Sequence, residues 1–146
     1  MLAATQPNPS SMKFLKLGFL ANPELGQLIL RGWLGLTMLI NHGIPKLMKF
    51  NEMAASFPDP LGVGSKASLC MAIFAEVLCS ALLVVGFFAR FAALSLAITM
   101  GVAFIVVHKA ALAPGPASGE LAFIYLAGFL ALLFCGAGQY SVDGED

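Results

Sequence analysis

Two charged residues lie inside apolar stretches of the sequence, where ionised side chains are costly. Arg31 belongs to the stretch of residues 25–42, and Glu76 lies near the middle of residues 67–88. Charges within a membrane are rare; they face the interior of a bundle and often pair with one another. Counting about 1.5 Å per residue places both side chains at neighbouring depths. We therefore expect a buried Arg31–Glu76 ion pair, acting either as a structural clamp or as a pair that responds to protons or substrate.

A second group of polar side chains is predicted to gather at one end of the same bundle. In a bundle of four helices that alternate in direction, the first and third helices end on the face where the fourth helix begins. This face lies opposite the chain termini. The loop after the first helix reaches this face too. The predicted members of this mouth are His42, Lys46, Asp59, His108, Glu120 and Tyr125.

Three interpretations of this mouth stay open. The first is interfacial hydrogen bonding that closes the bundle. The second is a head-group pocket for a small molecule or a quinone, built from His42, Lys46, His108, Glu120 and Tyr125, in which His or Lys donates to a carbonyl and a titratable group exchanges a proton. The third is a metal or haem site on the two histidines. No established metal or haem motif supports the third, so we predict no metal and no firmly bound cofactor, with a quinone as the ligand to consider.

The composition explains why these side chains must be positioned by membrane helices. The chain has 146 residues, of which 59% are hydrophobic and only 11% charged, and its formal net charge is zero. Soluble domains have about 25% charged residues. The composition therefore excludes a soluble globular domain, a disordered chain and a protein that binds nucleic acid through a basic patch. A small integral membrane protein with one domain remains.

Four apolar stretches predict an all-α, four-transmembrane-helix antiparallel bundle. They cover residues 25–42, 67–88, 91–107 and 121–135. Each approaches the roughly 20 residues that cross a hydrocarbon core, and in lipid such segments must be helices. Residues 1–23 are expected to be a polar tail and an interfacial segment, and residues 24–146 the membrane domain. Cys70, Cys79 and Cys135 lie in apolar stretches without a C-x-x-C pair and are interpreted as small hydrophobic residues.

The order of polar motifs along the chain resembles the DoxX family of small membrane proteins, from about Gln27 to Asp143. The motifs that carry the resemblance are Arg31, N-H-G-x-P-K (Asn41 to Lys46), Glu76, G-x-x-x-R-F-A-A-L (Gly86 to Leu94), His108, Glu120, Tyr125 and the tail C-G-A-G-Q-Y-S-V-D (Cys135 to Asp143). The resemblance implies a four-helix, multi-pass protein of the bacterial inner membrane. It also implies that Arg31, Glu76, His108 and Glu120 are signature residues.

The family takes its name from a membrane subunit linked to thiosulfate:quinone oxidoreduction, so the resemblance favours a role in a membrane redox complex. We expect an accessory or quinone-interacting subunit whose redox cofactors belong to protein partners. The alternative is a structural scaffold subunit at the periphery of a larger assembly, without chemistry of its own. The expected partners are membrane lipids and other membrane proteins, and no nucleic acid.

Overall fold

The computed structural model of the chain describes residues 22–115 and 117–144, and within these ranges every regular element is helical. The all-α prediction is therefore confirmed for this part of the chain. The predicted interfacial segment lies almost entirely in residues 1–21, outside the described residues. The elements are α2 (Pro23–Met38), η2 (Leu39–Gly43), α3 (Ile44–Met48), α4 (Phe50–Met53), α5 (Ser65–Ile73), η3 (Phe74–Cys79), α6 (Ser80–Val85), α7 (Ala89–Val102), η4 (Ala103–Val107) and α8 (Glu120–Cys135), where η marks a π-helical segment.

The first helix starts at α2 because its sequence satisfies the free amide groups of a helix N-terminus. The Asn22 side chain accepts a hydrogen bond from the Leu25 amide at 3.0 Å, and Pro23 occupies the first turn, where no N–H is needed. From there α2, η2 and α3 follow one another without a break. The buried residues of α2, Arg31, Gly35 and Met38, lie three or four positions apart and so form one stripe.

Two helical segments of the described chain are long and apolar enough to cross a membrane. They are Ser65–Val85, made of α5, η3 and α6, and Ala89–Val107, made of α7 and η4. At 1.5 Å per residue they are about 31 and 28 Å long, which matches a hydrocarbon core of about 30 Å. The apolar helix α8 is shorter, with 16 residues.

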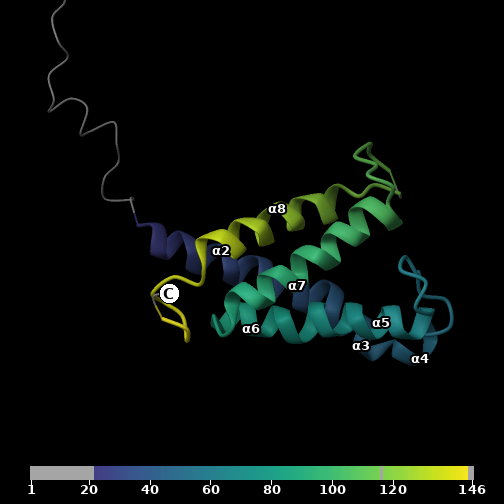
Figure 1. The fold of residues 1–146 in the computed structure, drawn as a ribbon, viewed down its shortest axis with the longest axis horizontal. Helices are drawn as coiled ribbons and strands as arrows, with labels where there is room; N and C mark the ends of the chain where they lie inside the picture. The colour runs from purple at the N-terminus through teal and green to yellow at the C-terminus, as the bar shows by residue number, and fades with distance from the viewer. Residues whose placement is uncertain (1–21, 116, 145–146) are drawn as a thin grey trace, which may run out of the picture.

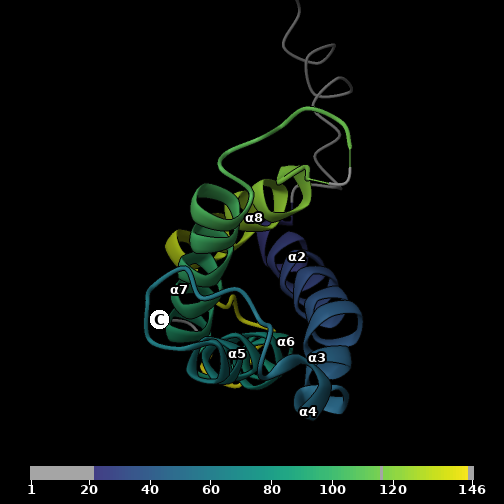
Figure 2. The same cartoon turned by 90° about the vertical axis from the view of Figure 1, so that its right-hand side faces the viewer.

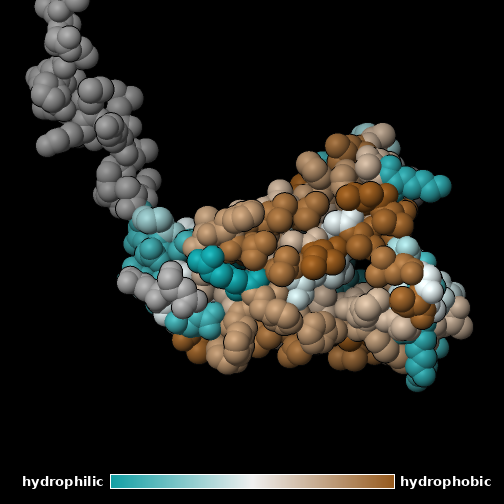
Figure 3. Space-filling model, in the orientation of Figure 1, coloured by the Kyte–Doolittle hydropathy of each residue, from teal (hydrophilic) through white to brown (hydrophobic). Residues whose placement is uncertain are grey.

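The helices form a bundle in which α7 packs along α8, and α2 packs against α6 (Figures 1 and 2). One end of the bundle holds the start of α2, the turn between α6 and α7, and the C-terminal tail. The opposite end holds α3, α4 and the start of α5 (Figure 1). The face seen in Figure 3 carries mostly apolar residues along its length, with hydrophilic residues gathered toward the two ends. This distribution is the one that a bundle needs to sit across a bilayer.

The turn between α6 and α7 is fixed by the C-terminal tail. Gly86 adopts a positive φ of 71°, and a Cβ at this position would collide with the Arg31 and Ser141 side chains. The Asp143 carboxylate accepts hydrogen bonds from the Phe88 and Ala89 amides, both at 2.9 Å, and so caps the first turn of α7. The tail therefore holds two neighbouring helices together at this end.

Candidate functional site

Arg31 belongs to the tail end of the bundle and does not pair with Glu76. Its guanidinium donates to the Val84 carbonyl at 3.2 Å and to the Tyr140 carbonyl, and the residue is 2% exposed. Glu76 instead pairs with Lys46, whose Nζ lies 2.6 Å from a carboxylate oxygen. The predicted Arg31–Glu76 pair is therefore wrong, and Arg31 joins the first helix, the second helix and the tail.

The register between the first two helices explains this correction. Gly35 lies against the Ser80 carbonyl and Val84, and Gly43 lies against the Glu76 carbonyl. Small residues let two helix backbones approach closely, so these two glycines fix the register. Arg31 lies one turn before Gly35 and so reaches the end of α6, whereas Glu76 lies about 18 Å further along, at the level of Gly43. A depth counted in residues from the helix ends takes no account of these close approaches, which set the register between the two helices.

A cavity of about 460 Å³ occupies the opposite end of the bundle. This volume lies within the roughly 300–1,000 Å³ that is usual for small-molecule sites. The lining is largely apolar and comes from the first helix, both candidate spans, the start of α8 and the loop before α5. The polar side chains that line it are those of His42, Lys46, Ser68, Glu76, Thr99, His108, Ser118 and Tyr125.

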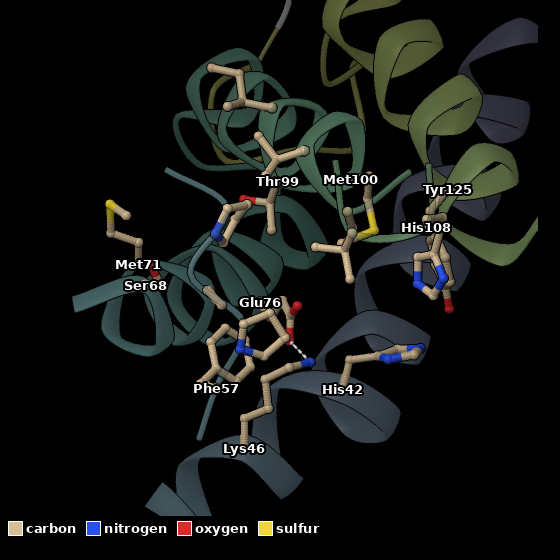
Figure 4. Close-up of a pocket in the computed structure, with 18 of the residues that line it drawn as sticks. His42, Lys46, Phe57, Ser68, Met71, Glu76, Thr99, Met100, His108 and Tyr125 are labelled. Atoms are coloured by element: carbon tan, nitrogen blue, oxygen red, sulfur yellow. Dashed lines mark hydrogen bonds and ion pairs between the residues drawn. The ribbon is translucent and has the colours of Figure 1, made fainter. Parts of the chain in front are cut away.

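The Lys46–Glu76 ion pair forms the charged centre of this pocket (Figure 4). The Glu76 side chain is 5% exposed and that of Lys46 is 20% exposed, so the carboxylate is almost withdrawn from water. Burial of a carboxylate costs free energy unless a partner charge or hydrogen bonds compensate for the lost water. Lys46 supplies both, and the two further protons of its ammonium group remain available to a third partner.

Aromatic and imidazole rings form a second side of the pocket. The His42 and Tyr125 rings meet edge to face, with centroids 5.8 Å apart, and His108 also lines the cavity. Nδ1 of His108 lies 3.1 Å from the Ala117 carbonyl. A proton on Nδ1 makes that contact a hydrogen bond and leaves Nε2 as an acceptor. The structure thus brings together four of the five predicted head-group residues: His42, Lys46, His108 and Tyr125.

Three π-helical segments surround the pocket and position its polar groups. η2 carries His42, η3 carries Glu76, and η4 ends directly before His108. A π-helical turn inserts an extra residue into a helix and rotates the following side chains, which is why such turns are frequent at functional sites. Here they direct polar residues of three separate helices toward one cavity.

Asp59 organises the loop that covers the end of the pocket. Its carboxylate accepts hydrogen bonds from the Ser68 hydroxyl at 2.7 Å, the Gly64 amide at 2.8 Å and the Val63 amide at 3.0 Å. The Ser68 hydroxyl, with these backbone amides, holds the pKa of Asp59 below its usual value. Asp59 does not itself line the cavity, but the loop that it fixes contributes Phe57, Pro58, Pro60 and Leu61.

Glu120 is exposed at the start of α8 and does not line the cavity, so its predicted place in the pocket is not met. The Glu120 backbone amide donates a hydrogen bond to the Ser118 hydroxyl at 3.3 Å. The carboxylate that lines the pocket is that of Glu76, which pairs with Lys46 and not with Arg31. Lys46 and Glu76 are thirty residues apart, on the two helices of one hairpin, and this placement is the sequence signal for their pairing.

Among the described residues, no cluster of three His, Cys, Asp or Glu could hold a metal ion.

The fold and the pocket together define an all-helical membrane protein with a polar site among its helices. Residues 26–109 match the family model for DoxX, and the chain belongs to the DoxX family. An uncharacterized protein of Haemophilus influenzae is 33% identical over 112 residues, which cover 74% of this chain and 81% of the relative. No solved structure matches the chain.

Proposed function

We propose that the pocket binds the head group of a quinone, and that the protein is an accessory or quinone-interacting subunit of a membrane redox complex. The observation that carries this proposal is the Lys46–Glu76 pair, 2.6 Å apart, inside an otherwise largely apolar cavity of about 460 Å³. A quinone ring is flat and apolar, with carbonyl oxygens that only accept hydrogen bonds. Such a ring needs apolar walls and a few donors, which is the composition of this cavity.

The polar residues fit these carbonyl oxygens chemically. Lys46 has ammonium protons beyond the one directed at Glu76, and the Tyr125 hydroxyl is a neutral donor. An imidazole ring can donate, accept or exchange a proton, so His42 and His108 suit a head group that takes up protons. The electron-transfer groups of the complex would belong to partner subunits.

The proposal includes a four-span arrangement in the bacterial inner membrane. The segments Ser65–Val85 and Ala89–Val107 supply two crossings by length and composition. The first helix packs along α6, and α8 packs along α7, so each would cross beside a neighbour. At 16 residues, α8 is about 24 Å long and would need a thin bilayer or flanking residues to complete its crossing.

Quinone binding to the purified protein in lipid nanodiscs tests the proposal. Lys46→Met and Tyr125→Phe should each weaken binding about tenfold or more, because each removes a hydrogen-bond donor from a largely apolar cavity. Glu120→Ala is the matched control, since this carboxylate is exposed and outside the cavity. Binding that is absent from the wild-type protein, or equal in all three variants, would refute the head-group pocket.

Co-purification from native membranes distinguishes the scaffold alternative from the pocket proposal. A redox partner that is recovered equally well with wild-type protein and with Lys46→Met shows that assembly does not depend on the pocket. If the same complex also keeps its quinone affinity and turnover, the protein is a scaffold and the pocket proposal fails.

A further inference from the structure

The pocket is bordered by a loop at the end of the bundle and also reaches the surface at its side. The loop residues Phe57, Pro58, Pro60 and Leu61 line the cavity at its end, and Asp59 ties this loop to α5. On the side, the lining includes Met71 of α5, which is 46% exposed, and Ile98 of α7, which is 59% exposed. Side chains that both line the cavity and lie on the surface mark the places where it opens, and the place between α5 and α7 lies on the side of the bundle. Leu61 of the loop, which is 57% exposed, marks another at the end.

The divergence of α5 and α7 creates this side opening. α7 packs against α6 and η3, but it is not closely packed against α5. The two helices separate from η3 onward, toward the end that carries α4 (Figure 1). Figure 3 shows a hollow in the same place, between the apolar masses of the α7–α8 side and the α5 side.

The depth of the opening places it within the hydrocarbon region. Met71 lies six residues, or about 9 Å, from the start of the span Ser65–Val85. Ile98 lies nine residues, or about 14 Å, from the end of the span Ala89–Val107 at the same end of the bundle. Both depths fall inside a hydrocarbon core of about 30 Å. With these two segments placed across a bilayer, the opening faces acyl chains.

We infer that the ligand is a tailed amphiphile that enters sideways from the bilayer between α5 and α7. Its head group lies at Lys46 and Glu76, and its apolar chain leaves past Met71 and Ile98 into the surrounding lipid. This inference rests on the proposed function and specifies the ligand class: a quinone with a long apolar side chain. A water-soluble molecule with the same ring lacks the part that the opening accommodates.

The experiment compares two benzoquinones with the same ring, one with a decyl side chain and one with a methyl group. Binding is measured by equilibrium dialysis of protein in nanodiscs, with empty nanodiscs subtracting partition into lipid. Ile98→Trp narrows the opening and should weaken binding of the decyl compound about tenfold, while leaving the methyl compound unchanged. Ile105→Trp is the matched control, because Ile105 is 62% exposed on the same span and does not line the cavity.

Unchanged binding of the decyl compound to Ile98→Trp, or equal weakening of both compounds, overturns the side entry. In that outcome the head-group pocket stands if Lys46→Met still weakens both compounds. Absence of binding of either compound to wild-type protein overturns the pocket and the side entry together.

A decyl compound with a photoreactive diazirine at its chain end provides a second measurement on the unmutated protein. Labelling of the peptides that contain Met71 and Ile98 supports the route through the side. Labelling confined to the loop 57–61 places the chain at the end of the bundle and overturns the inference.

Discussion

Gly43 lies directly against the backbone carbonyl of Glu76, at the point where the first helix crosses the second. A Cβ at position 43 would meet the Glu76 carbonyl and the Val77 side chain. The contact sets the height at which Lys46, one turn further along, meets the Glu76 carboxylate. Backbone packing and the charged centre of the pocket are therefore coupled.

Gly43→Ala should destabilise the protein by about 1–3 kcal/mol, because an added methyl group must push two backbones apart. The same substitution should lower quinone affinity by displacing Lys46 from Glu76. The loss of stability is measured by unfolding the purified protein in mild detergent with increasing amounts of a denaturing detergent. Gly32→Ala is the control, since nothing lies within 4 Å of a Cβ at that position. Equal stability of the two variants would contradict the close approach.

Lys46→Met should cost about 3 kcal/mol of stability, since it leaves the Glu76 carboxylate buried without its partner. The double variant Lys46→Met with Glu76→Gln should recover part of this loss, because no unpaired charge remains. Lys49→Met, at an exposed position one turn away, should leave the unfolding curve unchanged. A double variant no more stable than Lys46→Met alone would show that the pair is not the source of the effect.

Arg31→Met should release the C-terminal tail, because the Val84 and Tyr140 carbonyls both lose a charged donor. Hydrogen bonds to charged groups contribute about 1.5–3 kcal/mol each. Amide exchange in residues 140–144 should become faster, and limited proteolysis should cut the tail earlier. Arg31→Lys should restore little, since an ammonium lacks the planar fork that reaches two carbonyls. Unchanged protection of the tail in Arg31→Met would contradict this clamp.

Asp143→Ala should destabilise the turn between α6 and α7 by about 1 kcal/mol, the usual value for loss of a helix N-cap. The carboxylate accepts from both the Phe88 and Ala89 amides, so these two amides should lose protection first. Hydrogen exchange followed by mass spectrometry of the peptide that spans the turn provides the measurement. Asp143→Asn should retain part of the cap through its amide oxygen.

The loop that covers the pocket should depend on pH through Asp59. Hydrogen bonds from Ser68, Gly64 and Val63 lower its pKa from an ordinary value of 3.8. A depressed carboxyl pKa stabilises the folded loop fully above that ordinary value, and the contribution is lost as pH falls through the lower, folded value. Protection of the Gly64 amide should therefore persist to below pH 3.8 and disappear on further acidification. Asp59→Asn should abolish this pH dependence.

The sequence predicts the helical class well because composition and apolar length alone decide it. It also brings His42, Lys46, His108 and Tyr125 to one end, since helices that alternate in direction leave little choice of face. The pairing of Arg31 with Glu76 fails for a different reason. Helix register depends on close contacts at Gly35 and Gly43, and these contacts depend on the partner helix rather than on residue counts from the helix ends.

The loop over the pocket and the π-helical turns could not be predicted from hydropathy. Asp59 shows this for the loop: its role is a set of local hydrogen bonds that only the folded loop defines. η2 and η3 show it for the helices, because one extra residue in a turn changes which side chains face inward without changing composition. Glu76 lies within η3 and Lys46 follows η2, so both members of the ion pair depend on these turns.

The hydrogen bond from Arg31 to Tyr140 joins residues that are 109 positions apart in the chain. During synthesis the first helix leaves the ribosome long before Tyr140 does. Until then the guanidinium has no carbonyl from the tail to bind, and the contacts between the tail and the first two helices are missing. Closure of this end of the bundle is therefore a late step in folding.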